Sequence, residues 1–148
     1  MLASVEALAV ELARAAGVEA HAALSRTVDV AYKAGRKGKE DTNDPVSEVD
    51  HAVEALIRLR VGAEFPDHAI LGEEVESHPA ASEEWVWVVD PVDGTANFVN
   101  GFPLFAVSIG VLHHGRPVAG AIWCASTPAL RAGVYHAHLG GPLALDGV

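Results

Sequence analysis

The chain has 148 residues, of which 10 are basic and 20 are acidic, so its formal net charge is −10. Half of the residues are hydrophobic and 20% are charged, which is typical of one globular domain and excludes a disordered tail. The acidic balance disfavours nucleic acid and anionic membranes as partners and suits a site that collects cations. A single cysteine, no long apolar run and no signal peptide predict a soluble, cytoplasmic protein.

The first part of the chain is predicted to be mainly helical. Apolar residues recur at steps of three and four over residues 2–25, which indicates an amphipathic helix. Residues 27–32 are β-branched and aromatic and are expected to form a short strand, and 33–43 a mobile loop. A second helix is expected from a capping-box-like start at Ser47 to about Gly62.

The rest of the chain is predicted to form a sheet. Short apolar runs indicate strands at 68–71, 85–89, 104–112, 117–124 and 133–137. The run at 104–112 is nearly continuous, as expected for a strand buried on both faces, and a glycine-containing hairpin loop at 113–116 follows it. The order of elements predicts an α+β fold, with two N-terminal helices packed on a largely antiparallel sheet.

Acidic residues gather where two predicted strands end. Glu73 and Glu74 follow one strand, Asp90 ends the next, and Asp93 comes three residues later in a turn that contains proline. If the two strands are neighbours, these carboxylates converge and repel one another unless a metal ion neutralises them. Oxygen ligands without clustered Cys or His favour Mg²⁺, Ca²⁺ or Mn²⁺, and two such ions would suit phosphoryl transfer. For any one of these acids alone, a water-facing strand end is the simpler interpretation.

The Asp93-Gly94-Thr95 segment has two interpretations. Asp-Gly is the commonest hairpin signal, so a plain turn accounts for it. Alternatively, 96–99 lacks strand alternation and begins a short helix capped by Asp93, so that the N–H groups of Gly94 and Thr95 form an anion site. A calcium loop is rejected because the position of its closing glutamate is Gly101.

Three segments, taken in order, resemble the inositol monophosphatase family of lithium-sensitive, magnesium-dependent sugar-phosphate phosphatases. They are DPVSEVD at 44–50, GEE at 72–74 and WVVDPVDGTANF at 87–98. The last is long and highly specific, and the resemblance continues to the end of the chain. It implies a phosphatase in which a metal-activated water attacks the phosphate directly, since the motif holds no Ser, Cys or His nucleophile.

The resemblance also implies a set of metal ligands, with two or three Mg²⁺ per complete site. Glu73 is similar to the family's shared ligand, which also helps to polarise the attacking water. Asp90 corresponds to the carboxylate that bridges two ions. The main-chain carbonyl of Val92 corresponds to a ligand of the first ion, and Asp93 to a ligand of the second.

The remaining roles implied by the resemblance concern water and substrate. Thr95 and Asp50 are similar to the pair that orients and deprotonates the attacking water. The amides of Gly94 and Thr95 correspond to the phosphate cradle. Lys39 matches the family's loop lysine in spacing, while Ala96 departs from the family pattern by replacing a second threonine.

The length of the chain is the larger departure from the family. Family members are about twice as long, so residues 1–148 are expected to be the N-terminal metal- and phosphate-binding domain, without the C-terminal α/β domain, and a poor catalyst alone. The leading substrate is myo-inositol monophosphate. Histidinol phosphate, fructose 1,6-bisphosphate and adenosine bisphosphate stay open, as does a truncated, non-catalytic metal-binding domain. We also expect a homodimer.

Three further features have simpler structural interpretations. His113 and His114, at the tip of a hairpin, could bind a transition metal, but solvated turn residues are the simpler interpretation. His136 and His138 share one face of a strand at a spacing that can chelate a metal. Cys124 lies in an apolar strand, where a buried, inert thiol is expected.

Overall fold

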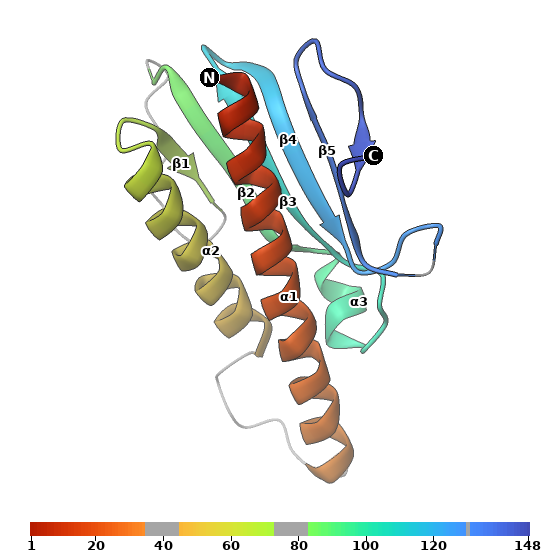
Figure 1. Cartoon of the computed structure of the whole chain (residues 1–148). Helices are drawn as coiled ribbons and strands as arrows, with labels where there is room; N and C mark the ends of the chain where they lie inside the picture. Colours follow the sequence, from red (N-terminus) through yellow and green to blue (C-terminus); the bar gives the residue numbers. More distant parts are fainter. Residues whose placement is uncertain (35–44, 73–82, 130) are drawn as a thin grey trace.

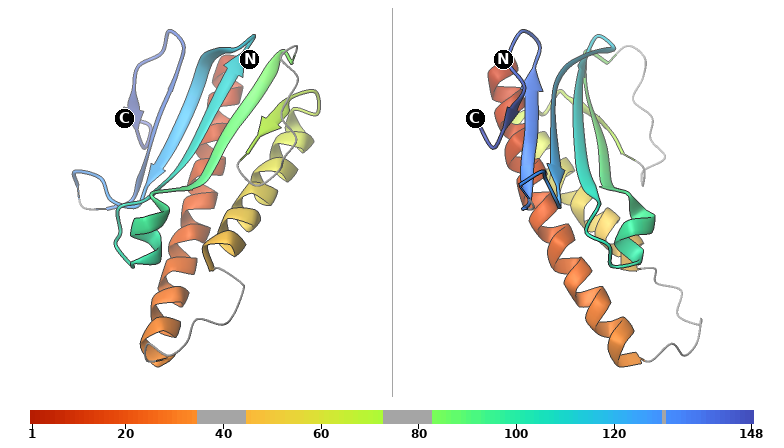
Figure 2. Two further views of the ribbon diagram at one scale, coloured as in Figure 1. Left: turned by 180° about the vertical axis from the view of Figure 1, so that it is seen from behind. Right: turned by 90° about the vertical axis from the view of Figure 1, so that its right-hand side faces the viewer.

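The computed structural model describes residues 1–34, 45–72, 83–129 and 131–148. Two long helices, α1 and α2, lie side by side on one face of a single sheet, as the front and back views show (Figures 1 and 2). A short helix, α3 (Thr95–Val99), lies at one end of this sheet. The α+β fold predicted from the sequence is therefore confirmed. Within the described residues, no helix is both long and apolar enough to cross a membrane.

Helix α1 spans Leu2–Ala34 and α2 spans Pro45–Glu64. The strand predicted at 27–32 is wrong, because this segment continues α1. Its β-branched residues disfavour a helix only weakly, and extending an existing helix costs less than starting a new element. The helix start predicted at Ser47 is also wrong, since α2 already begins at Pro45, whose ring suits the first helical turn. Most of the loop predicted at 33–43 lies outside the described residues.

The strands follow one another across the sheet in sequence order. Strand β1 pairs with β2 in parallel and all other neighbours are antiparallel, so the predicted largely antiparallel sheet is confirmed. The strand bounds are Ala69–Leu71 for β1, Trp85–Asp93 for β2, Ala106–His113 for β3, Arg116–Cys124 for β4, Gly133–His138 for β5 and Ala144–Leu145 for β6.

The core lies between the sheet and the two long helices. Helix α2 contributes one stripe at helical spacing, with Val53, Ile57 and Val61 fully buried. Strand β3 is not buried on both faces as predicted, because its residues alternate between buried and half-buried. The buried set, which includes Val107 and Ile109, faces the helices. The opposite face of the sheet is therefore the less covered one.

The hairpin between β3 and β4 forms as predicted. His113 and Arg116 pair across it, and the two residues between them, His114 and Gly115, have φ angles of 48° and 74°. Two consecutive residues with positive φ are typical of the tight turn that matches the twist of paired strands. This turn lies at the end of the sheet beside the N-terminus, whereas α3 lies at the other end (Figure 1).

Candidate metal centre

The end of β2 carries a bulge that brings two carboxylates to one face of the sheet. Asp90 pairs with Ser108 and Asp93 pairs with Ala106, so three steps along β2 match two steps along β3. Directly paired residues share a face, and Ser108 and Ala106 are two residues apart on β3. Asp90 and Asp93 therefore lie on the same face, whereas in a regular strand they would lie on opposite faces.

A pocket of about 360 Å³ opens beside Asp90, on the face away from the helices. It is lined by the end of β1 together with the adjoining parts of β2 and β3, namely Leu71, Gly72, Val88, Val89, Asp90, Ser108 and Gly110. Convergence of the acidic residues required the strands that end near 71 and 90 to be neighbours, and β1 does pair with β2 in parallel.

A buried ion pair on α2, between Glu54 and Arg58, packs against the end of β1. Glu54 is only 2% exposed, and its Oε1 accepts a hydrogen bond of 2.7 Å from Nε of Arg58. A Cβ at Gly72 would lie 2.2 Å from Oε2 of Glu54, so a larger residue here would force the Glu54 carboxylate to move. The close approach of this carboxylate explains the glycine of the GEE segment.

Thr95 and Gly94 form the corner between β2 and α3, which spans Thr95–Val99. The short helix predicted here is confirmed, but its N-cap is Gly94 and not Asp93. Gly94 has φ 88°, a left-handed conformation that favours glycine. The Thr95 hydroxyl donates a hydrogen bond of 3.0 Å to the carbonyl of Val92. The hydroxyl is therefore tied to the same carbonyl that the sequence analysis expected to bind metal.

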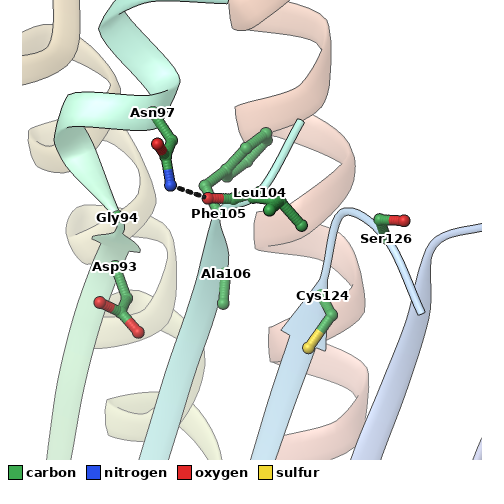
Figure 3. A pocket seen from close by; sticks show the side chains of 8 residues that line it. All are labelled: Asp93, Gly94, Asn97, Leu104, Phe105, Ala106, Cys124 and Ser126. Carbon is green, nitrogen blue, oxygen red and sulfur yellow. Dashed lines mark hydrogen bonds between the residues drawn. The ribbon is translucent and has the colours of Figure 1, made fainter. Parts of the chain in front are cut away.

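Helix α3 is anchored to the strand that follows it. Phe98 is fully buried and contacts the Phe105 ring edge to face, with centroids 5.2 Å apart. Nδ2 of Asn97 donates to the carbonyl of Leu104 over 2.8 Å (Figure 3). These contacts hold the Asp93–Gly94 corner in place from the far side of α3.

A second pocket of about 350 Å³ lies on the Asp93 side of the corner, and Figure 3 shows its lining. Cys124 lines this pocket and is half-buried, so the fully buried thiol predicted from the sequence is wrong. Burial, and then the negative charge of Asp93, raise the pKa of the Cys124 thiol. A protonated thiol is a poor nucleophile, which agrees with the expected lack of reactivity.

The structure thus brings together Asp90, Val92, Asp93, Gly94 and Thr95 within one strand end and corner. The predicted Asp50 is half-buried on α2, near the start of that helix. Helix α2 contacts both β2 and α3, and it begins at the α3 end of the sheet (Figure 1).

Three residues singled out in the sequence, Glu73, Glu74 and Lys39, lie outside the described residues. Their expected roles stay predictions.

The donors at this corner suit a hard cation. Two carboxylates share a face, and a main-chain carbonyl lies between them in the chain. The carbonyl of Val92 has a second lone pair besides the one that accepts the Thr95 hydroxyl. Oxygen donors of this kind are the ligands that Mg²⁺, Mn²⁺ and Ca²⁺ prefer.

Comparison with models of protein families gives a match over almost the whole chain. The model of the inositol monophosphatase family matches residues 1–147. The chain belongs to the inositol monophosphatase family. The segments at 44–50, 72–74 and 87–98 are thus family segments, as their resemblance predicted.

Individual members of the inositol monophosphatase family agree with this assignment. A probable inositol 1-monophosphatase, ImpA of Mycobacterium tuberculosis, is 40% identical over 123 residues, which are 80% of this chain and 42% of that protein. A histidinol-phosphatase of Chlorobaculum parvum is 38% identical over 109 residues, 74% of this chain and 39% of that protein. The crystal structure of inositol monophosphatase-II from Staphylococcus aureus MSSA476 superposes with a TM-score of 0.77 at 32% identity, covering 98% of this chain and 49% of that one. The chain spans about half the length of these relatives, or less.

The two histidine pairs that the sequence offered as possible metal ligands each lie beside a glutamate in the fold. Nδ1 of His136 lies 2.7 Å from Oε1 of Glu6, and Nδ1 of His138 contacts Oε2 of the same carboxylate. This carboxylate joins α1 to β5. His113 and His114 lie beside Glu84 at the opposite end of β2 from Asp93. Sequence patterns gave no signal for either carboxylate, because each approaches its histidines only through tertiary structure.

Proposed function

We propose that this chain forms the metal- and phosphate-binding part of a Mg²⁺-dependent phosphatase that hydrolyses small phosphate monoesters. The observation that carries the proposal is the bulge in β2. It puts Asp90 and Asp93 on one face, directly before the Gly94 corner. Membership of the inositol monophosphatase family supports the same chemistry.

In this proposal Asp90, Asp93 and the carbonyl of Val92 hold divalent cations together with Glu73. Bound Mg²⁺ supplies charge neutralisation and an acidified water as the nucleophile. Oxygen donors fixed on a strand and its bulge need little rearrangement to bind a cation, because the backbone already sets their direction.

The attacking water is oriented by Thr95 and Asp50. Since the Thr95 hydroxyl donates its hydrogen bond to the Val92 carbonyl, its oxygen lone pairs are left to accept a hydrogen bond from water. Asp50 then takes up the proton that the water loses. The backbone amides of Gly94 and Thr95 bind the phosphate oxygens.

For the substrate, we propose myo-inositol monophosphate first. Histidinol phosphate and fructose 1,6-bisphosphate are alternatives, since relatives bear the names of phosphatases for each. Adenosine bisphosphate stays a further alternative from the family resemblance. A non-catalytic, metal-binding role differs from all of these in predicting cation binding without turnover.

The proposal predicts that Mg²⁺ stabilises the chain. One ion bound at a hundred times its dissociation constant adds about 2.7 kcal/mol to the free energy of unfolding. Thermal melts with and without millimolar Mg²⁺ measure this, and Asp90→Asn is expected to abolish the shift. Asp67→Asn, an exposed acid in the turn after α2, is the matched control and should keep it. An unchanged melting temperature in the unaltered chain would refute the site.

A further inference from the structure

A second cluster of metal-binding side chains lies at the other end of the sheet. It consists of Glu84, just before β2, His113 at the end of β3, and His114 in the turn after β3; we call it the Glu84 cluster. Oε1 of Glu84 lies 3.1 Å from Nε2 of His113 and 4.0 Å from Nε2 of His114. In the part of the chain that the structure describes, these three residues each offer one ligand atom, all within 4.8 Å of one another.

Backbone pairing holds the Glu84 cluster together. Trp85, the residue after Glu84, pairs with His113 across the sheet. The N–H of His114 donates a 2.8 Å hydrogen bond to the carbonyl of Glu84. The three ligand residues are thus fixed by the ladder between β2 and β3 and by the tight turn, and not by flexible side-chain contacts alone.

Aromatic rings support the imidazole of His113 from one side. Its ring centroid lies 4.2 Å from that of Trp85, and Trp85 in turn stacks on His68 at 5.1 Å with the ring planes 6° apart. The rings limit the directions that His113 can take. This lowers the conformational entropy that His113 would lose on binding a ligand.

We propose that the Glu84 cluster is a site for a divalent transition-metal ion such as Zn²⁺, Co²⁺ or Ni²⁺. Two imidazole nitrogens with one carboxylate favour these ions over Mg²⁺. Zinc ligands lie about 2.0–2.1 Å from the ion, which places them roughly 3.4 Å apart in tetrahedral geometry. The observed separations of 3.1 and 4.0 Å from Oε1 of Glu84 bracket this value, and all three ligand atoms lie within 4.8 Å of one another.

This site is distinct from the centre at Asp90 and Asp93. Nine residue-to-residue steps along β2 separate Glu84 from Asp93, a span of roughly 30 Å at about 3.3 Å per step. The side chains of Glu84, His113 and His114 are 61%, 34% and 68% exposed, so the ion would have access from solvent. An exposed three-ligand site leaves a coordination position for water or for a ligand from another molecule.

Calorimetric titration of the whole chain with Zn²⁺, in the presence of excess Mg²⁺, tests the proposal. Mg²⁺ occupies the Asp90–Asp93 centre, while the Glu84 cluster is expected to bind one Zn²⁺ per chain. His113→Ala and Glu84→Gln should each weaken this binding by at least about tenfold. His114→Asn should do the same, and asparagine suits the positive φ at this position.

His51→Gln, a change at an exposed histidine on α2, is the matched control and should leave Zn²⁺ affinity unchanged. Circular dichroism melts of each variant in the absence of zinc verify that the chain still folds, and His114→Asn alters only an exposed turn residue. The absence of Zn²⁺ binding in excess Mg²⁺ would overturn the proposal. So would equal affinity in the unaltered chain and in folded His114→Asn.

Discussion

Pro91 explains why the strand end can bulge between the two carboxylates. Proline has no N–H to donate to a neighbouring strand, so a regular ladder would gain no hydrogen bond at this position. Pro91 and Val92 are both buried, which fixes the extra residue in place. The bulge at Pro91 and Val92 therefore places Asp90 and Asp93 on the same face of the sheet.

Thr95 is the residue whose proposed role is easiest to separate from metal binding. In a two-domain chain that carries these 148 residues, Thr95→Ala should lower kcat by about 10²- to 10⁴-fold, because assistance to the attacking water is lost. Magnesium affinity, measured in the same variant, should stay nearly constant, since the threonine contributes no metal ligand in this proposal. Equal losses in turnover and in Mg²⁺ affinity would mark the hydroxyl as a structural tie to Val92.

At the residue scale, the sequence singled out the residues of the proposed centre but not how they come together. The motif from 87 to 98 is local and specific, so Asp90, Asp93, Gly94 and Thr95 could be singled out without a structure. The shared face of Asp90 and Asp93 could not, because it depends on the register against β3.

Among the elements, α1 packs closely on the sheet at Gly17. A Cβ at this position would lie 2.0 Å from Cδ2 of Trp123 on β4. Gly17→Ala should therefore lower the free energy of unfolding by about 1–3 kcal/mol, as overpacking usually does. Urea denaturation measures the change.

Gly62→Ala is the matched control for Gly17→Ala. Gly62 also lies within a helix, α2, but a Cβ there would meet nothing within 4 Å. This change should stabilise the chain by about 0.5–1 kcal/mol, since alanine loses less backbone entropy than glycine in a helix. Similar effects of the two substitutions would contradict close packing of α1 on Trp123.

The contacts of Glu6 on α1 with His136 and His138 on β5 should make the stability of the fold depend on pH. Burial works to raise the pKa of Glu6, but hydrogen bonds to His136 and His138 outweigh it and lower the pKa below the ordinary 4.5. A lowered pKa means that the carboxylate stabilises the fold above pH 4.5 and that this contribution is lost as pH falls through the lower value. Glu6→Gln should therefore reduce the melting temperature at pH 7, and this effect should fade as the pH falls through the lowered pKa of Glu6. A difference between the two proteins that stays constant throughout an acid titration would contradict this role of Glu6.

At the element scale, prediction succeeded where a pattern reflects burial. Apolar residues at helical spacing over 2–25 predicted the first long helix, and apolar runs predicted five of the strands. The segment at 27–32 was predicted wrongly because its β propensity is local, whereas α1 simply continues through it. The two-residue strand β6 is too short to leave a pattern.

At the scale of the whole molecule, the sheet separates two chemically different ends. One end gathers oxygen donors at Asp90 and Asp93, and the other gathers imidazoles at His113 and His114. Figure 2, left, shows the sheet from the side away from α1 and α2. The pocket beside Asp90 opens on this face. The homodimer expected from the family resemblance stays a prediction.

The most direct test of the central claim locates a hard cation on the chain. Amide resonances of the ¹⁵N-labelled protein are recorded while Mn²⁺, a paramagnetic substitute for Mg²⁺, is added in substoichiometric amounts. The account predicts that resonances from Val89 to Thr95 broaden first, that excess Mg²⁺ reverses the broadening, and that Asp90→Asn prevents it. Broadening confined to residues near Glu84, or none at all between Val89 and Thr95, would contradict the assignment of this strand end as the metal centre.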